Sequence, residues 1–311
     1  MPILYEEIGQ RLRAYRMGSG LSADELARRI GISRTALYRF EQGELAKIDT
    51  LERLAELLGV SIPTLLGVGI EYIPSPVGYF ERLRQIEEAS DQIVALSGPM
   101  SFLLSSEGFE DTLEEVLAEN ITPALMASER TRADIAIIMG ILRQRKEAYQ
   151  KRRPSIVNLM SAFEVERFLD NGLLGRRGLP DEVRNRRNAI ARAEMAHFLK
   201  LIEEQPIGVQ IGIVPDTVPH LGFQIFRQPT RKLLAVSPFR LGGEPNVRVG
   251  VAMITSAHDG IALHEAAVDE MWQRALKGEA AAAFLRHMLS PERLPLDADQ
   301  LNKWAEEPPA G

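Results

Sequence analysis

Residues 21–43, LSADELARRIGISRTALYRFEQG, constrain the fold more than any other stretch, because they place two short helices on either side of a tight turn. Ser22, followed three residues later by Glu25, is a capping box that predicts the start of the first helix. Gly31 tolerates the positive φ that the turn requires, and Ser33 caps the second helix. Two helices joined in this way indicate a helix-turn-helix, in which the second helix protrudes and the first braces it.

The flanking segments complete a small helical domain. Residues 3–17 place apolar side chains at helical spacing, and residues 49–60 repeat a capping pattern before a second amphipathic run. Ser61 then opens a last short turn of helix. Five short helices are therefore expected within residues 1–70.

The same stretch resembles the Cro/C1-type helix-turn-helix of the Xre family of bacterial transcriptional regulators. The shared features are the Leu-Ser start, Glu25-Leu26-Ala27, the Gly31-Ile32-Ser33 turn, the aromatic-Arg-aromatic-Glu-Gln-Gly ending, and Leu-Leu-Gly-Val in the next helix. The resemblance implies a lambda-repressor-like DNA-binding domain over residues 1–70, with the helix Ser33–Gln42 in the major groove. Relatives often carry a glutamine where this chain has Ala23, so their base preferences do not transfer.

The resemblance also implies which side chains meet double-stranded DNA. The candidates for base contact are Arg34, Thr35, Tyr38 and Arg39. The candidates for contact with the DNA backbone are Ser22, Ser33 and Lys47. Arg34 is the first candidate for a bidentate guanine contact, because a guanidinium matches the two acceptors of guanine. For Tyr38 and Arg39 a solvated helix face remains the alternative, since phosphate contacts usually outnumber base contacts.

Composition and charge narrow the class of protein. The formal net charge is −6, and residues 1–68 carry nine basic and nine acidic side chains, so folding must sort the signs onto different faces before this segment can bind phosphate. The absence of cysteine excludes disulfides, thiolate metal sites and cysteine nucleophiles. No apolar run reaches the roughly 18–20 residues of a membrane span, and no signal peptide opens the sequence, so a cytoplasmic protein without membrane contact is expected.

The rest of the chain predicts a second domain with α/β or α+β character. Pro74-Ser75-Pro76 suggests a linker over 71–78, followed by an α/β domain over 79–292 and a polar tail over 293–311. Helices are expected at 79–90, 109–121, 130–151, 180–204, 264–278 and 278–289. Strands are expected at 93–96, 155–161, 207–216 and 247–256, with a hairpin over 223–238.

Residues 130–290 resemble, in pattern only, the poorly characterised C-terminal domain of many long Xre-type regulators. That resemblance implies a sensing or dimerising module without naming a ligand. No G-x-S-x-G, P-loop, HExxH or G-x-G-x-x-G motif is present, and no histidine has a lysine two residues later. We therefore expect no enzyme activity, no cofactor and no metal, although His258-Asp259 and His264-Glu265 leave a metal pair as the minor alternative.

Two basic clusters, 143–153 and 176–192, could be a solvated face or a network of salt bridges, or they could contact an anionic effector, DNA or another protomer. The salt-bridge interpretation is favoured because acidic stretches flank both clusters. Phe163 and Trp272 are expected to anchor the core, since large aromatic side chains are mostly buried.

Taken together, these patterns predict a sequence-specific transcriptional regulator that binds palindromic operators as a homodimer. Long helices within 79–125 and 130–200 would supply the dimer interface, and the C-terminal domain would modulate DNA binding through a small molecule or a partner protein. The alternative is an antitoxin-like or controller protein, whose large domain captures a protein partner and whose DNA binding is autoregulatory.

Overall fold

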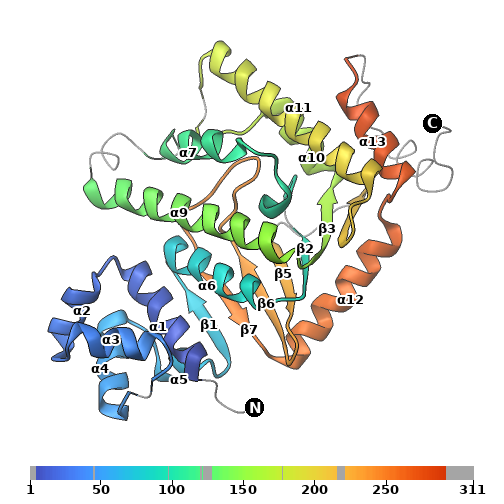
Figure 1. Ribbon diagram of the computed structural model, residues 1–311. Helices are drawn as coiled ribbons and strands as arrows, with labels where there is room; N and C mark the ends of the chain where they lie inside the picture. The colour runs from blue at the N-terminus through green and yellow to red at the C-terminus, as the bar shows by residue number, and fades with distance from the viewer. Residues whose placement is uncertain are drawn as a thin grey trace.

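The structure, a computed structural model, describes residues 5–44, 46–96, 98–119, 121, 128–176, 178–215 and 221–291. The tail expected over 293–311 lies outside these residues. Five helices form the N-terminal part, and a sheet with helices on both faces forms the rest (Figure 1). The predicted fold class, an all-α five-helix domain followed by an α/β domain, is confirmed.

The N-terminal helices are α1 (Tyr5–Ser19), α2 (Ala23–Ile30), α3 (Arg34–Glu41), α4 (Ile48–Leu58) and α5 (Ile62–Leu66). Their shared core is made by Leu12, Leu26, Leu37 and Leu54, all fully buried. The capping pattern expected to begin at Asp49 is wrong by two residues, because Lys47 is the N-cap of α4 and Asp49 lies in its first turn.

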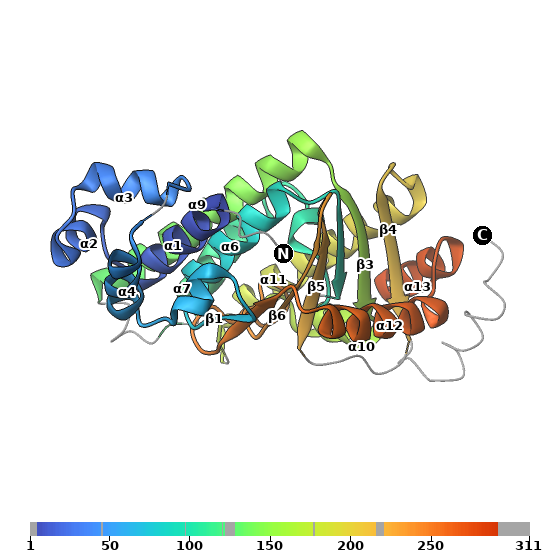
Figure 2. The same cartoon turned by 90° about the horizontal axis from the view of Figure 1, so that it is seen from below.

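Seven strands form one sheet in the order β1-β7-β6-β5-β2-β3-β4. Figure 2 shows β1, β6, β5, β3 and β4 in this succession from left to right. The strands are β1 (Ile70–Ile73), β2 (Gln92–Leu96), β3 (Ser155–Ser161), β4 (Val209–Val214), β5 (Gly222–Arg227), β6 (Lys232–Ser237) and β7 (Ala252–Thr255). The neighbours β2, β3 and β4 are parallel, and all other pairs are antiparallel. The hairpin predicted over 223–238 is confirmed as β5 and β6.

The sheet separates two apolar cores because side chains alternate along each strand. On one face, α12 (His258–Arg274) packs on residues such as Val94 and Leu159. The other face, which includes Ile93 and Ile156, is covered by most of the remaining helices. These are α6 (Pro76–Glu88), η1 (Phe102–Leu104), α7 (Phe109–Glu119), α9 (Glu129–Arg152), α10 (Ala162–Asn171), α11 (Asp181–Glu204) and α13 (Glu279–Leu289).

The linker expected over 71–78 is wrong, because this segment is folded into the sheet domain. Strand β1 pairs with β7, and α6 begins at Pro76 with Ser75 as its N-cap. Proline suits the first position of a helix, where its missing N–H costs nothing, so the proline pair ends a strand and opens a helix. Helix α6 is buried along nearly its whole length, so this part of the segment 79–125 is not available as an interface with a second copy.

A buried ion-pair cluster joins the N-terminal helices to the sheet. Arg11 Nε of α1 lies 2.5 Å from Glu71 Oε1 of β1, and Arg82 Nε of α6 lies 3.0 Å from Glu71 Oε2. All three side chains are buried. At the rim, Glu7 of α1 also pairs with Arg231 of the β5–β6 turn. The helix-turn-helix segment is thus attached to the sheet through charged side chains, three of which are buried.

The basic clusters predicted at 143–153 and 176–192 mostly form intramolecular ion pairs. Arg145 donates to Glu87 through Nε at 2.8 Å and Nη2 at 2.7 Å, and both side chains are buried. Arg187 Nη2 donates to Glu119 Oε1 at 2.9 Å. These contacts support the salt-bridge interpretation for the arginines that make them; Arg177 lies outside the described residues.

The two predicted aromatic anchors differ. Trp272 of α12 is partly buried against its core, as expected. The prediction for Phe163 is wrong, because its side chain is 56% exposed. Helix α10 begins immediately after β3, and Val165 and Phe168 fill the core at helical spacing, which leaves Phe163 on the outer side.

Candidate nucleic-acid interface

Helices α2 and α3 are fixed at a defined angle by the capping residues that the sequence contains. Ser22 Oγ accepts a hydrogen bond from the backbone N–H of Glu25 at 3.1 Å, and Ser33 Oγ accepts one from Ala36 at 3.1 Å. Gly31 ends α2 with a φ of 72°, in the left-handed region that favours glycine. The turn therefore adopts the geometry expected of a helix-turn-helix.

The four predicted base-contacting residues lie on one exposed face of α3. All four side chains, Arg34, Thr35, Tyr38 and Arg39, are exposed, whereas Leu37 on the opposite side is completely buried. The structure thus brings these four residues together on one surface. Their contact with DNA stays a prediction.

Arg34 is held in position by its neighbours. Its Nη1 donates to Asp24 Oδ2 at 3.1 Å, its Nη2 donates to Tyr38 Oη at 3.1 Å, and the guanidinium lies 5.3 Å from the centre of the Tyr38 ring. The hydrogen bond with Tyr38, and then the charge of Asp24, raise the pKa of Arg34. Arg39 pairs with Glu44 on the same surface. Exposed ion pairs of this kind are weak, so a base edge or a phosphate can replace them.

The three predicted DNA-backbone residues share a structural role that the sequence pattern revealed only in part. Ser22, Ser33 and Lys47 are the N-cap residues of α2, α3 and α4. Each therefore lies where backbone N–H groups and the helix dipole favour an anion. Lys47 is exposed, and its ammonium, which can only donate hydrogen bonds, is suited to a phosphate and not to capping the N–H groups of α4.

Helix α1 braces α3 through contacts that sequence analysis missed. Arg16 donates to Glu41, the last residue of α3, through Nε at 2.5 Å and Nη2 at 3.1 Å. A Cβ placed on Gly9 of α1 would lie 2.5 Å from the carbonyl oxygens of Phe40 and Glu41. The one available signal was an isolated glycine inside a helical pattern, which often marks close backbone packing.

We expect Gly9→Ala to lower the free energy of unfolding by about 1–3 kcal/mol, because the new methyl group meets backbone that cannot move aside cheaply. The matched control is Gly140→Ala in α9, where a Cβ meets no atom within 4 Å. That substitution is expected to stabilise the protein by about 0.5–1 kcal/mol. Chemical denaturation of both variants measures the difference. Equal effects would show that α1 does not pack on α3 this closely.

The possible metal pair at His258-Asp259 and His264-Glu265 lies in the described part of the chain. Among those residues, no three histidine, aspartate or glutamate side chains converge as metal ligands. His264 Nδ1 lies 2.8 Å from the carbonyl oxygen of Gly260, and its ring packs edge-on against Phe223. None of the described helices is both long and apolar enough to span a membrane.

The fold and the exposed face of α3 define a helix-turn-helix protein, and comparison with known sequences agrees. Residues 7–66 match the family described as a helix-turn-helix domain. Pyrobaculum aerophilum has a protein named as a candidate HTH-type transcriptional regulatory protein that is 40% identical over 55 residues, covering 17% of this chain and 22% of the relative. A protein of the same description from Pyrococcus furiosus is 29% identical over 160 residues, covering 50% of this chain and 44% of the relative. The aligned part spans less than half of each relative.

Proposed function

We propose that this protein is a transcriptional regulator that binds specific double-stranded DNA through α3. The observation that carries this proposal is the exposed face of α3, which presents two arginines, a threonine and a tyrosine to solvent. The two arginines form ion pairs only with exposed carboxylates. The regulators named among its relatives support the same function. The major groove admits such a helix, and arginine is its commonest specific reader of guanine.

We further propose that the protein acts as a homodimer on palindromic operators. A single recognition helix contacts only a few base pairs, so two half-sites are needed for the affinity typical of specific regulators. The C-terminal α/β domain would then modulate DNA binding through an effector, because it is attached to α1 by buried charged contacts.

Selection of DNA by the purified protein from a pool of random duplexes tests the proposal. We expect an inverted repeat with half-site centres about 10 base pairs apart or a multiple of that spacing. Sedimentation of the protein with the selected duplex should give two chains per DNA. Recovery of unrelated sequences, or of a single half-site bound by one chain, would contradict the proposed specificity or the proposed dimer, respectively.

A further inference from the structure

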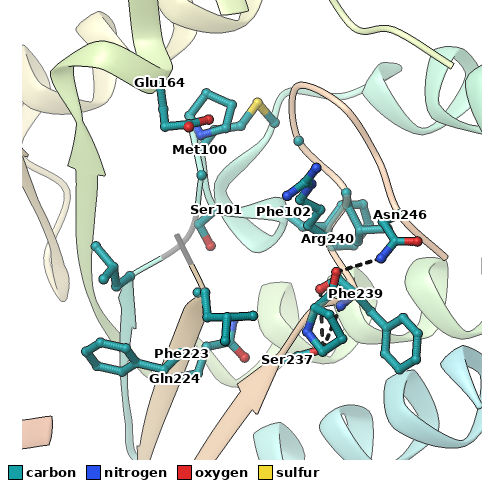
Figure 3. A pocket seen from close by; sticks show the side chains of 18 of the residues that line it. Met100, Ser101, Phe102, Glu164, Phe223, Gln224, Ser237, Phe239, Arg240 and Asn246 are labelled. Carbon is teal, nitrogen blue, oxygen red and sulfur yellow. Dashed lines mark hydrogen bonds between the residues drawn. The ribbon is translucent and has the colours of Figure 1, made fainter. Parts of the chain in front are cut away.

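The α/β domain contains a cavity of about 690 Å³ at the carboxyl ends of β2 and β3 (Figure 3). Leu96 and Ser161, the last residues of these two strands, line it together with the start of β5. From β2 the chain continues to β3 on one side, whereas β5 lies on the other side of β2. Ligands of open α/β sheets commonly bind outside the carboxyl ends of the parallel strands, and β2 and β3 both end at this cavity.

Aromatic rings form a large part of the cavity wall. Its rings come from α6, η1, α7, β5 and the chain after β6: Tyr79, Phe80, Phe102, Phe109, Phe223 and Phe239. Two more apolar side chains extend the cavity to the surface, since Phe163 is 56% exposed and Leu221 is 51% exposed. The volume falls in the range of sites for small organic molecules.

The charges of the cavity leave one cation without a balancing carboxylate among the described residues. Arg145 is neutralised by Glu87, and Arg167 is paired with Glu164 at 3.1 Å. Arg240 instead donates from Nε to the backbone carbonyl oxygen of Glu244 at 2.8 Å, and its side chain is exposed. Its remaining guanidinium hydrogens are available to an anionic group, which arginine binds in bidentate fashion.

The segment that carries Arg240 is held in place by hydrogen bonds. Phe239 donates its backbone N–H to Ser237 Oγ at 2.9 Å, and Asn246 Nδ2 donates to the Pro238 carbonyl oxygen at 3.0 Å (Figure 3). The amide of Gln224 also lines the cavity, and its Oε1 is buried with no hydrogen-bond partner in the described part of the chain. If the Gln224 amide rotated toward the cavity, a hydrogen-bond donor on a ligand would satisfy that oxygen.

We propose that this cavity binds a small organic anion with an aromatic or branched apolar body, whose acidic group is held by Arg240. The aromatic wall buries the body, and the unbalanced guanidinium selects an anion over a neutral molecule of the same shape. The proposal goes beyond DNA recognition and names the class of effector for the α/β domain.

The cavity is connected to the recognition helix by two packed helices. Phe80 and Leu83 of α6 line the cavity. Gly78 of the same helix lies so close to α1 that an added Cβ would be 3.1 Å from the Ala14 carbonyl oxygen. Arg16 of α1 in turn donates two hydrogen bonds to Glu41, the last residue of α3. A ligand that shifts α6 therefore shifts the helix that positions α3; this step of the inference rests on the proposed function.

Two fluorescent probes with the same aromatic body test the site in the full chain. The first is 8-anilinonaphthalene-1-sulfonate, which is an anion, and the second is N-phenyl-1-naphthylamine, which is neutral. We expect one saturable sulfonate site per chain. Arg240→Gln should weaken sulfonate binding about tenfold or more and leave the neutral probe unchanged, because only the sulfonate forms charge-assisted hydrogen bonds. Phe163→Ala should weaken both probes.

Matched controls separate the cavity from general surface binding. Leu263→Ala removes a side chain on α12 that is 71% exposed, and Arg274→Gln removes an arginine on the same helix; neither should affect either probe. Absence of a saturable site, or no effect of Phe163→Ala, would overturn the site. Equal effects of Arg240→Gln on the two probes, or none, would overturn the anionic class.

The coupling is measured separately, as the affinity for the selected DNA with and without saturating sulfonate. A change of severalfold that disappears in Arg240→Gln supports the connection through α6 and α1, and no change overturns it. Failure of DNA binding alone would overturn the proposed function while leaving the probe result, and hence the ligand site, intact.

Discussion

Replacing Glu71 by glutamine is expected to lower the free energy of unfolding by about 3–5 kcal/mol, which is the usual cost of removing one partner from a buried ion pair. Glu71 balances two buried guanidinium groups, those of Arg11 and Arg82. With a neutral glutamine, buried Arg82 would lose the carboxylate that balances it, and Arg11 would keep only Glu7, whose Oε2 lies 3.2 Å from its Nη2. Urea denaturation followed by circular dichroism measures the loss.

The matched control is Glu114→Gln, which breaks an exposed pair with Arg143 at 2.8 Å. Exposed pairs contribute little to stability, so this variant should unfold nearly as the parent does. If the two variants were equally stable, the buried cluster would not hold the helix-turn-helix domain to the sheet.

The same carboxylate predicts how stability depends on pH. Burial by itself would raise the pKa of Glu71, but the charges of Arg82 and then Arg11 outweigh it and hold the pKa below the ordinary value of 4.5. As pH falls below 4.5, Glu71 takes up a proton in the unfolded chain before it does so in the folded protein. The stability that Glu71 contributes is therefore complete above pH 4.5 and is lost as the pH falls from there through its pKa in the folded protein. In the Glu71→Gln variant this component of the acid dependence should be missing.

Replacing Arg34 by alanine is expected to remove most of the preference for operator over random DNA while leaving the fold and the proposed dimer intact. A bidentate arginine–guanine contact contributes about tenfold to a hundredfold in discrimination per half-site, and a dimer makes it twice. The side chain is exposed and supports no core contact, so unfolding curves should barely change. Competition binding against random duplexes measures the ratio of specific to nonspecific affinity.

Lys47→Ala is the comparison that separates a contact with bases from a contact with phosphates. A lysine on a phosphate carries no sequence information, so its loss should weaken specific and random DNA about equally and reduce the salt dependence by about one ion per contact. If Arg34→Ala behaved in this same uniform way, Arg34 would be a phosphate contact and the assignment of the reading face would be wrong.

Local rules predicted the N-terminal helices well because their ends are encoded locally. Ser22, Gly31 and Ser33 specify caps and a turn through hydrogen bonds that span only a few residues. Strand β1 escaped prediction for the opposite reason, whereas α10 was missed although Ser161 caps it locally. β1 is four residues long and owes its existence to pairing with β7, nearly 180 residues later.

The candidate sites also differ in whether local sequence patterns could predict them. The outward face of α3 follows from helical periodicity, and it could be listed residue by residue from the sequence. The bracing of α3 by Arg16 and the cavity near Arg240 depend on segments brought together only by the tertiary fold. Phe163 illustrates the limit, since aromatic composition suggests burial and only the start of α10 shows that it faces outward.

The central claim is that α3 reads specific DNA, and genome-wide mapping of bound DNA in cells tests it most directly. The same mapping with an Arg34→Ala, Thr35→Ala double variant serves as the comparison. We predict discrete sites that share an inverted repeat and that disappear in the variant, while both proteins are present at equal levels. Diffuse or absent binding, or sites unchanged in the variant, would contradict the account and would direct attention to protein partners of the α/β domain.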